Sequence, residues 1–316
     1  MTMLASSTFP YPDCSRRVVE EIAAPEWPAL QQGPRPWLWL NGAHNENLEA
    51  EVRAITRRFD HQWVWRGTDL EYQHPGYRRG PMLVQLDDAL LEQFLFGWGP
   101  QAGVILRVGD HGPELLGHLQ RLHQLIAADG LPVSFSLGAA RHLEELCEAL
   151  PAIRLAELLG PIQALVWRGP EDQGAQWLQA RNAHAPAPSL APDRYFTLTA
   201  SEESALDHAS KAWFMRDSVR HFSRRDPRWG GPANQLELSR QLTTFAEEAE
   251  RIAVGLERDV RHYMALRLAY PQAPFMMDAV LRMHLSQHQV AGLQRMYALE
   301  DRLRQTVDAN APGSAT

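Results

Sequence analysis

Apolar residues follow two alternating patterns along the first half of the chain. Short uninterrupted apolar runs, such as PWLWLNGA at residues 36–43, are typical of buried strands. The segments between these runs carry apolar residues three or four positions apart, as at Leu48, Val52 and Ile55, which form one face of a helix. The strands predicted in this way cover residues 36–43, 61–68, 81–87, 103–108, 131–137 and 162–169. The helices predicted between them cover residues 48–59, 91–98, 113–128, 139–149 and 151–159.

Strands that alternate with helices indicate an α/β layer in which at least some neighbouring strands are parallel. Only a short, loop-rich segment separates the apolar runs at 61–68 and 81–87, which favours an antiparallel relation there. We therefore expect an α/β fold with a mixed sheet flanked by helices.

The pattern changes after a proline-rich segment, AHAPAPSLAPD at residues 183–193, whose composition is typical of a linker. Beyond it the spacing is helical throughout and begins with Thr199 and Glu202, the spacing of a helix capping box. The helices predicted here cover residues 200–224, 234–254, 256–269, 275–288 and 289–307. The predicted parts are a leader at 1–35, an α/β domain at 36–170, a linker at 171–195, an all-α lobe at 196–308 and a flexible tail at 309–316.

The bulk composition is that of an ordinary globular protein, with 45% hydrophobic residues among 316. The net charge of -7 argues against nucleic acid as the main partner, because such binding depends largely on neutralised phosphates. Cys14 and Cys147 lie far apart and have no metal-ligand spacing, so we expect a reduced, cytoplasmic protein. We expect neither a cleaved signal peptide nor a membrane span, since no apolar run approaches the length that either needs.

The usual catalytic signatures are absent from the sequence, which has no Gly-x-Ser-x-Gly elbow, phosphate loop, Gly-x-Gly-x-x-Gly or His-Glu-x-x-His. Their absence agrees with a protein that is not an enzyme and that needs no metal or cofactor. His284 and His288, one helical turn apart, are the strongest metal candidates, but no third ligand is identifiable and a structural role is preferred. The alternative is a metal-dependent or hydrolytic enzyme of unrecognised type that uses this histidine-rich helical lobe.

Two groups of residues are candidates for binding a protein partner. The segment RHFSRRDPR at 220–228 carries arginines that either complement the C-terminal end of a helix, the preferred reading, or meet an acidic partner surface. Tryptophans in or beyond the linker are candidate interface anchors, although a core position is preferred for any single one. The candidate partner-binding residues are Trp177, Trp213, Arg220, Arg224, Arg225, Arg228 and Trp229.

The stretch LFGWGPQAGVIL at residues 95–106 sets a glycine on each side of Trp98, between a predicted helix and a predicted strand. A phosphate-binding loop places its glycines before a helix, so the order here excludes that function. Gly97 or Gly99 can instead supply the left-handed turn that ends the helix. We expect a structural corner in which the Trp98 indole packs against the sheet.

Several short motifs occur in a characteristic order along residues 36–168. They are Leu38-Trp39-Leu40-Asn41-Gly42-Ala43, Val64-Trp65-Arg66-Gly67-Thr68, Gly80-Pro81-Met82-Leu83-Val84, Gly97-Trp98-Gly99 and Leu159-Gly160-Pro161-Ile162. In this order they resemble the N-terminal domain of the bacterial type VI secretion effector-loading adaptors, also called effector-associated chaperones. The residues that carry the resemblance include Gly42, Gly67, Gly80, Pro81, Gly97, Trp98, Gly99, Gly160 and Pro161. The chain departs from the family pattern at Asn41, where an acidic residue is usual, and in the segment 135–141.

The resemblance implies a non-catalytic cytoplasmic adaptor that binds a cognate secreted effector (a toxin) and the VgrG spike protein, so that the effector is loaded before secretion. The all-helical region suits the variable second lobe of that family. Such a protein needs two binding surfaces rather than a reactive pocket, because it acts by holding two partners at a high local concentration. A general protein-binding module outside secretion is the remaining non-enzymatic alternative.

Overall fold

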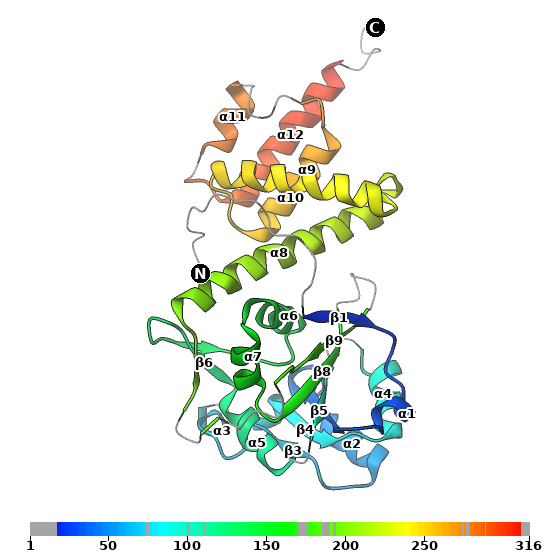
Figure 1. Ribbon diagram of the computed structural model, residues 1–316. Helices are drawn as coiled ribbons and strands as arrows, with labels where there is room; N and C mark the ends of the chain where they lie inside the picture. Colours follow the sequence, from blue (N-terminus) through cyan, green and yellow to red (C-terminus); the bar gives the residue numbers. More distant parts are fainter. Residues whose placement is uncertain are drawn as a thin grey trace. The chain divides into compact units, whose positions relative to one another are not determined.

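The computed structural model describes residues 18–73, 76–99, 102–109, 112–169, 176–184, 190–191, 194–273, 275, 279–287 and 289–310. The chain divides into two compact units, Ser15–Trp213 and Phe214–Thr316, which we call the sheet unit and the helical unit. The division falls inside one long helix, α8 (Ala200–Arg225). This helix is drawn in one piece in Figure 1.

The sheet unit is built on a seven-stranded sheet with the order β1-β9-β8-β5-β2-β4-β3. Its strands are β1 (Val19–Ile22), β2 (Arg35–Asn41), β3 (Gln62–Trp63), β4 (Pro81–Gln85), β5 (Gly103–Val108), β8 (Ile162–Arg168) and β9 (Trp177–Arg181). Every neighbouring pair in this sheet is antiparallel. The parallel pairing expected from the alternation of strands and helices is therefore not found in the large sheet.

A second, three-stranded sheet has the order β10-β6-β7. Its strands are β6 (Gln124–Ile126), β7 (Pro132–Ser134) and β10 (Phe196–Thr197). Strand β10 runs parallel to β6, whereas β6 and β7 form an antiparallel hairpin whose turn contains Gly130 at a positive φ of 84°. The predicted combination of an α/β domain with mixed strand directions is confirmed, with the parallel pair in this small sheet.

Helices and short turns cover both faces of the large sheet (Figure 1). They are α1 (Trp27–Leu30), η1 (Gly42–His44), α2 (Leu48–Thr56), α3 (Asp69–Gln73), η2 (Tyr77–Arg79), α4 (Asp88–Phe96), α5 (Gly112–Arg121), α6 (Ala140–Ala149) and α7 (Ala152–Leu159). The alternation of side chains along β2 divides them between two cores. Trp39 packs into the core formed with α5, α6 and α7, while Leu38 and Leu40 pack into the core formed with α2 and α4.

Three segments differ from the sequence-based expectation. The predicted leader contributes the edge strand β1, and the Glu148 carboxylate on α6 accepts hydrogen bonds of 3.2 Å from the N–H groups of Val18 and Val19. Residues 177–181, placed in a linker, form strand β9 beside β8. The helix predicted over 113–128 ends at Arg121, because the residues after it alternate as strand β6. Most of the proline-rich stretch and all of 311–316 lie outside the described residues.

The helical unit contains the second half of α8, a short turn η4 and four further helices, as the sequence predicted for an all-α lobe. They are η4 (Pro227–Trp229), α9 (Pro232–Arg251), α10 (Glu257–Ala269), α11 (Ala279–Leu285) and α12 (Gly292–Asn310). At its centre, the buried Arg295 donates hydrogen bonds of 2.6 to 2.9 Å to the carbonyls of Leu285, Ile252 and Ala253. One guanidinium thus satisfies backbone carbonyls at the C-terminal ends of two helices, α9 and α11.

The capping box at the start of α8 is confirmed. The Thr199 hydroxyl accepts a hydrogen bond from the Glu202 N–H, and the Glu202 carboxylate accepts one of 2.8 Å from the Thr199 N–H. Among the described residues, no helix combines the length and the apolar character that crossing a membrane would need.

Candidate functional site

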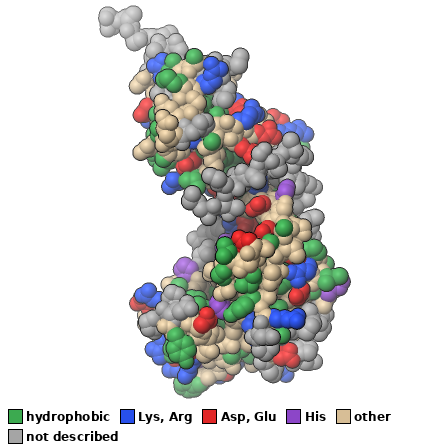
Figure 2. All heavy atoms as spheres, turned by 90° about the vertical axis from the view of Figure 1, so that its left-hand side faces the viewer, with side chains coloured by type: hydrophobic (Ala, Val, Ile, Leu, Met, Phe, Trp, Pro, Cys, Tyr) green, Lys and Arg blue, Asp and Glu red, His purple; other side chains and the backbone are tan. Residues whose placement is uncertain are grey.

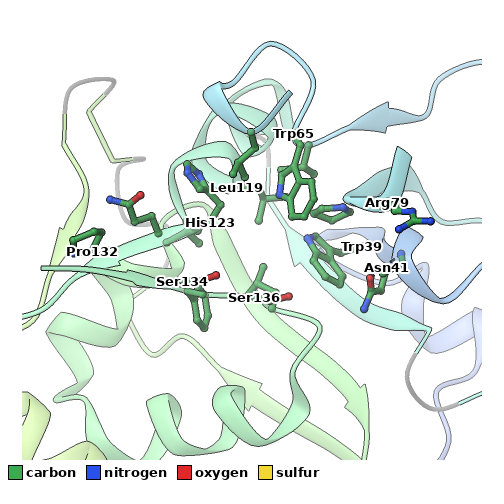
Figure 3. Close-up of a pocket in the computed structure, with 17 residues that line it drawn as sticks. Trp39, Asn41, Trp65, Arg79, Leu119, His123, Pro132, Ser134 and Ser136 are labelled. Atoms are coloured by element: carbon green, nitrogen blue, oxygen red, sulfur yellow. Dashed lines mark hydrogen bonds between the residues drawn. The ribbon is translucent and has the colours of Figure 1, made fainter. Parts of the chain in front are cut away.

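A pocket of about 530 Å³ lies in the sheet unit, where segments from residues 39 to 137 meet (Figure 3). Two indoles, Trp39 at the end of β2 and Trp65 after β3, form one part of its wall. Leu119 lies in α5, His123 in the turn that follows it, and Ser134 and Phe135 come from β7 and the residue after it. We call this site the indole pocket.

Two glycines of the motif set allow the chain to close tightly behind the indoles. A Cβ added at Gly80 would lie 2.4 Å from the Trp65 ring, and one at Gly42 would lie 2.4 Å from the Gly80 carbonyl oxygen. The Gly42 N–H also donates a hydrogen bond of 3.1 Å to that carbonyl. Any side chain at either position would displace the backbone or the indole, so these glycines, followed by Pro81 in the pocket wall, shape the indole pocket.

His123 is the one imidazole in the pocket wall, and its two nitrogens have different surroundings. Its Nδ1 lies 2.5 Å from the carbonyl oxygen of Gln120, which can only accept, so Nδ1 carries a hydrogen. Its Nε2 is buried and forms no hydrogen bond to the described residues. The Asp69 carboxylate oxygen lies 3.8 Å from this nitrogen, beyond hydrogen-bonding distance but close enough for an ion pair with a protonated ring.

The polar groups of the pocket do not form a nucleophile–base–acid arrangement. A hydrolytic triad needs a histidine that bridges a hydroxyl and a carboxylate through its two nitrogens. Here a backbone carbonyl occupies Nδ1 of His123, and the Ser136 hydroxyl accepts a hydrogen bond of 3.2 Å from the Gly138 N–H. No group of three His, Cys, Asp or Glu side chains with metal-binding geometry occurs in the described part of the chain.

A second histidine of α5, His118, lies in the protein interior. Its Nε2 donates a hydrogen bond of 2.9 Å to the Leu158 carbonyl, and its Nδ1 accepts one of 3.3 Å from the Leu190 N–H. Burial lowers the pKa of His118 to about 4, and the charge of Arg121 contributes in the same direction. Gly160 has a φ of 54°, and a Cβ there would lie 2.5 Å from the His118 ring. In the Gly160-Pro161 motif, the missing side chain of Gly160 therefore leaves room for the His118 ring. We call this contact the clasp.

The Gly97-Trp98-Gly99 corner follows the sequence-based interpretation, with one refinement. Gly97 closes α4 in a right-handed conformation, and Gly99 supplies the left-handed turn at φ 84°. The Trp98 ring is half-buried against the core that contains α2 and α4, and its Nε1 donates a hydrogen bond of 2.7 Å to the Glu51 carboxylate. Gly67 also adopts a positive φ, of 79°, with open space beside it.

Residues 37–157 match the family model of a domain of unknown function, DUF4123. The match covers less than half of the chain and ends just before the last residues of α7. It includes the whole indole pocket and the His118 side of the clasp. No curated protein and no solved structure matches the chain.

Two of the tryptophans proposed as interface anchors are buried within this chain. Trp177 lies in β9, outside the DUF4123 region, and packs edge-on against Phe94 with ring centroids 5.6 Å apart. Trp213 lies in α8, with the Arg141 guanidinium 4.5 Å from its ring centroid. Their packing matches the core position that the sequence favoured for any single tryptophan, and their role in partner binding stays a prediction. Trp229 is half-buried against the core of the helical unit.

The arginines of 220–228 lie at the end of α8, next to a groove of about 490 Å³. Arg224 and Arg225 are exposed, and Arg220 is half-buried. The Arg228 guanidinium donates two hydrogen bonds to the Asp226 carboxylate, which lowers the pKa of that carboxyl. Other cations of this groove also contact acids: Arg261 pairs with Asp217, Arg258 with Asp259, and His262 with Glu300. The positive charge is thus largely matched, and binding of an acidic partner at this groove stays a prediction.

The metal hypothesis for the helical lobe involves residues outside the described part of the chain. His288 and the side chain of His284 both lie outside the described residues.

Sequence reasoning missed the indole pocket, because its residues come from segments that each resemble ordinary core or loop. The uncharged run LPVSFSL at 131–137 was its one visible signal.

Proposed function

We propose that this protein is a non-catalytic adaptor of a bacterial type VI secretion system, which binds a secreted effector and the VgrG spike protein. The observation that carries the proposal is that the motif resemblance and the family match cover nearly the same stretch of the chain. The motif resemblance to effector-loading adaptors covers about residues 36–168, and the DUF4123 match covers 37–157. Both fall within the sheet unit.

The architecture supports a protein that works through surfaces. Each of the two units has its own hydrophobic core, so each can present a stable surface to a different partner. Two binding surfaces on one chain raise the local concentration of one partner near the other. Each interface of this kind buries about 1,200 to 2,000 Å² in total, with a few anchor residues contributing most of the affinity.

The test is co-expression of this chain with the VgrG and effector proteins encoded beside it, followed by size-exclusion chromatography. We expect all three proteins to elute together, and the effector and VgrG to elute separately when this chain is omitted. Co-elution of effector and spike without this chain would contradict the proposal, as would a folded chain that binds neither.

A charge-reversal pair tests the contribution of the arginine patch. Arg224→Glu with Arg225→Glu removes two exposed cations at the end of α8. If an acidic partner surface meets them, the complex is lost. Arg240→Glu with Arg251→Glu makes the same charge change at two exposed positions of α9 and is the matched control. Equal retention of the complex by both pairs would remove the patch from the interface.

A further inference from the structure

Strand β7 has one unpaired edge among the described residues, since it is the last strand of the small sheet. The Phe135 N–H donates to the His123 carbonyl, and the Ala127 N–H donates to the Leu131 carbonyl, so odd-numbered residues of this segment face β6. Because the direction of backbone groups alternates along an antiparallel strand, Pro132 and Ser134 direct theirs to the open side. That side therefore presents the Ser134 N–H and the carbonyls of Pro132 and Ser134.

The other strand edges of the sheet unit have protective features that β7 lacks. Strand β1 carries the exposed acids Glu20 and Glu21, and β3 is only two residues long. At β10, the Arg154 guanidinium donates a hydrogen bond of 2.7 Å to the Thr197 carbonyl. Charges, short length and covering groups are the usual ways in which proteins prevent pairing at a sheet edge.

Strand β7 has the opposite composition. The segment 131–137 has no charged residue, all three residues of β7 are exposed, and two apolar side chains beside the edge are 62% (Leu131) and 44% (Val133) exposed. Figure 2 faces the side of the molecule that carries β6 in Figure 1 and shows exposed hydrophobic atoms on this side of the sheet unit. An uncharged edge of this kind is suited to pair with another uncharged strand.

The indole pocket begins directly at this edge. Pro132, Ser134 and Ser136 line the pocket, and Figure 3 shows Ser134 and Ser136 along the same strand segment. A strand added to β7 would direct every second side chain toward the pocket, because side chains alternate along a strand. The wall that such side chains would meet is apolar and aromatic, with Trp39, Trp65 and Phe135 among its residues.

We propose that β7 and the indole pocket together bind an extended, uncharged segment of a partner protein. The segment adds to β7 as a strand, through the backbone groups of Ser134 and Pro132, and inserts an aromatic side chain between the indoles and Phe135. The ring would cover the apolar wall of the pocket. The assignment of this segment to the effector or the spike rests on the proposed function, whereas the peptide site itself does not.

The experiment is selection of a displayed library of random peptides, each about ten residues long, on the purified full-length chain. We expect enrichment of uncharged peptides with alternating apolar residues and an aromatic residue. A synthetic peptide of the enriched sequence, followed by fluorescence anisotropy, then gives the affinity for each variant. Because the library contains neither effector nor spike, its result is independent of the co-expression test.

Substitutions at Ser134 separate backbone recognition from side-chain recognition. Ser134→Pro removes the outward N–H and should weaken peptide binding by about tenfold or more, whereas Ser134→Ala keeps the N–H and should leave binding within about twofold. Val133→Lys adds a charge beside the edge without changing the backbone and should also weaken binding. Hydrogen exchange at the Ser134 amide should slow when the peptide is bound, and circular dichroism checks that each variant is folded.

Three outcomes would overturn the inference. One is a selection that enriches no sequence, and another is a peptide that binds wild type and Ser134→Pro equally well. The third is a dimer of this chain that Ser134→Pro converts to monomer, which would make a second copy the occupant of the edge.

Discussion

Two histidines, His118 in α5 and His123 in the turn after it, show how differently a buried imidazole can be held. His118 is fully buried, and both of its ring nitrogens bond to backbone groups of other segments. His123 is also mostly buried, but among the described residues only its Nδ1 forms a hydrogen bond, and the Asp69 carboxylate lies 3.8 Å from its Nε2. The first ring is therefore fixed by two distant segments, whereas the second is held mainly by the turn to which it belongs. The comparison predicts that the two histidines contribute unequally to stability.

The largest loss of stability is expected from Gly160→Ala, beside the buried His118. Its Cβ would lie 2.5 Å from the His118 ring, and its backbone has a positive φ. We expect a loss of about 3 kcal/mol or more in the free energy of unfolding, measured by urea denaturation. Gly117→Ala on α5 is the control, because its Cβ would meet only the Arg121 guanidinium at 3.5 Å, and it should be neutral or slightly stabilising. A similar loss in both variants would contradict the clasp.

The second prediction concerns pH. Because the folded-state pKa of His118, about 4, lies below its ordinary value of 6.5, folding favours the neutral ring. Its contribution to stability is complete above pH 6.5 and falls as the pH decreases toward 4, by about 3 kcal/mol over the whole range. Unfolding free energies of wild type and His118→Gln, measured from pH 7 to about 4, should converge as the pH falls. Parallel curves would show that His118 is not the titrating group.

Trp98 is an intermediate case, because its ring is half-buried but its Nε1 is bonded to Glu51. We expect Trp98→Ala to destabilise the protein by about 2 kcal/mol, less than the full cost of removing a buried aromatic ring. Trp98→Phe keeps most of the ring and loses the hydrogen bond, so its cost should be about 1 kcal/mol. Equal costs for the two variants would mean that the hydrogen bond, rather than the packing, determines the stability of this corner.

The smallest effect on the unfolding free energy is expected at His123. His123→Leu removes one hydrogen bond to Gln120 and a nitrogen that forms none with the described residues, so the unfolding free energy should change by less than about 1 kcal/mol. His118→Leu is the matched comparison and should cost about 2 to 3 kcal/mol, because it leaves the Leu158 carbonyl and the Leu190 N–H unsatisfied. If His123→Leu were the more damaging variant, the predicted difference between the two histidines would be wrong.

The helical elements were largely predictable because their signals are local. Helix α10, for example, covers Glu257–Ala269, and the spacing of apolar residues predicted 256–269. Strand direction was not predictable in this way, because antiparallel pairing of β5 with β2 and β8 depends on contacts between segments far apart in sequence. Strand β9 was missed since its five residues lie directly before the proline-rich segment 183–193 and were assigned to the linker with it.

The candidate site was less predictable than the fold. The glycines behind the indoles were identified as motif residues, but their close approach to Trp65 and to each other appears only in three dimensions. Trp39 and Phe135 are buried like any core residue, and nothing in the local sequence indicates that the pocket lies between them. The unbonded nitrogen of His123 has no sequence signal, because it results from the positions of all its neighbours.

The continuity of α8 affects how the protein can be divided for study. In the first part of α8, Leu206 and Trp213 pack against residues of the sheet unit. The turns from Phe214 onward belong to the helical unit. A fragment that starts after the proline-rich stretch would therefore carry an uncovered apolar half-helix, and the remaining piece would lose part of its core. Expression of either half alone would favour aggregation, so binding measured on such halves would report this damage as well as the partner.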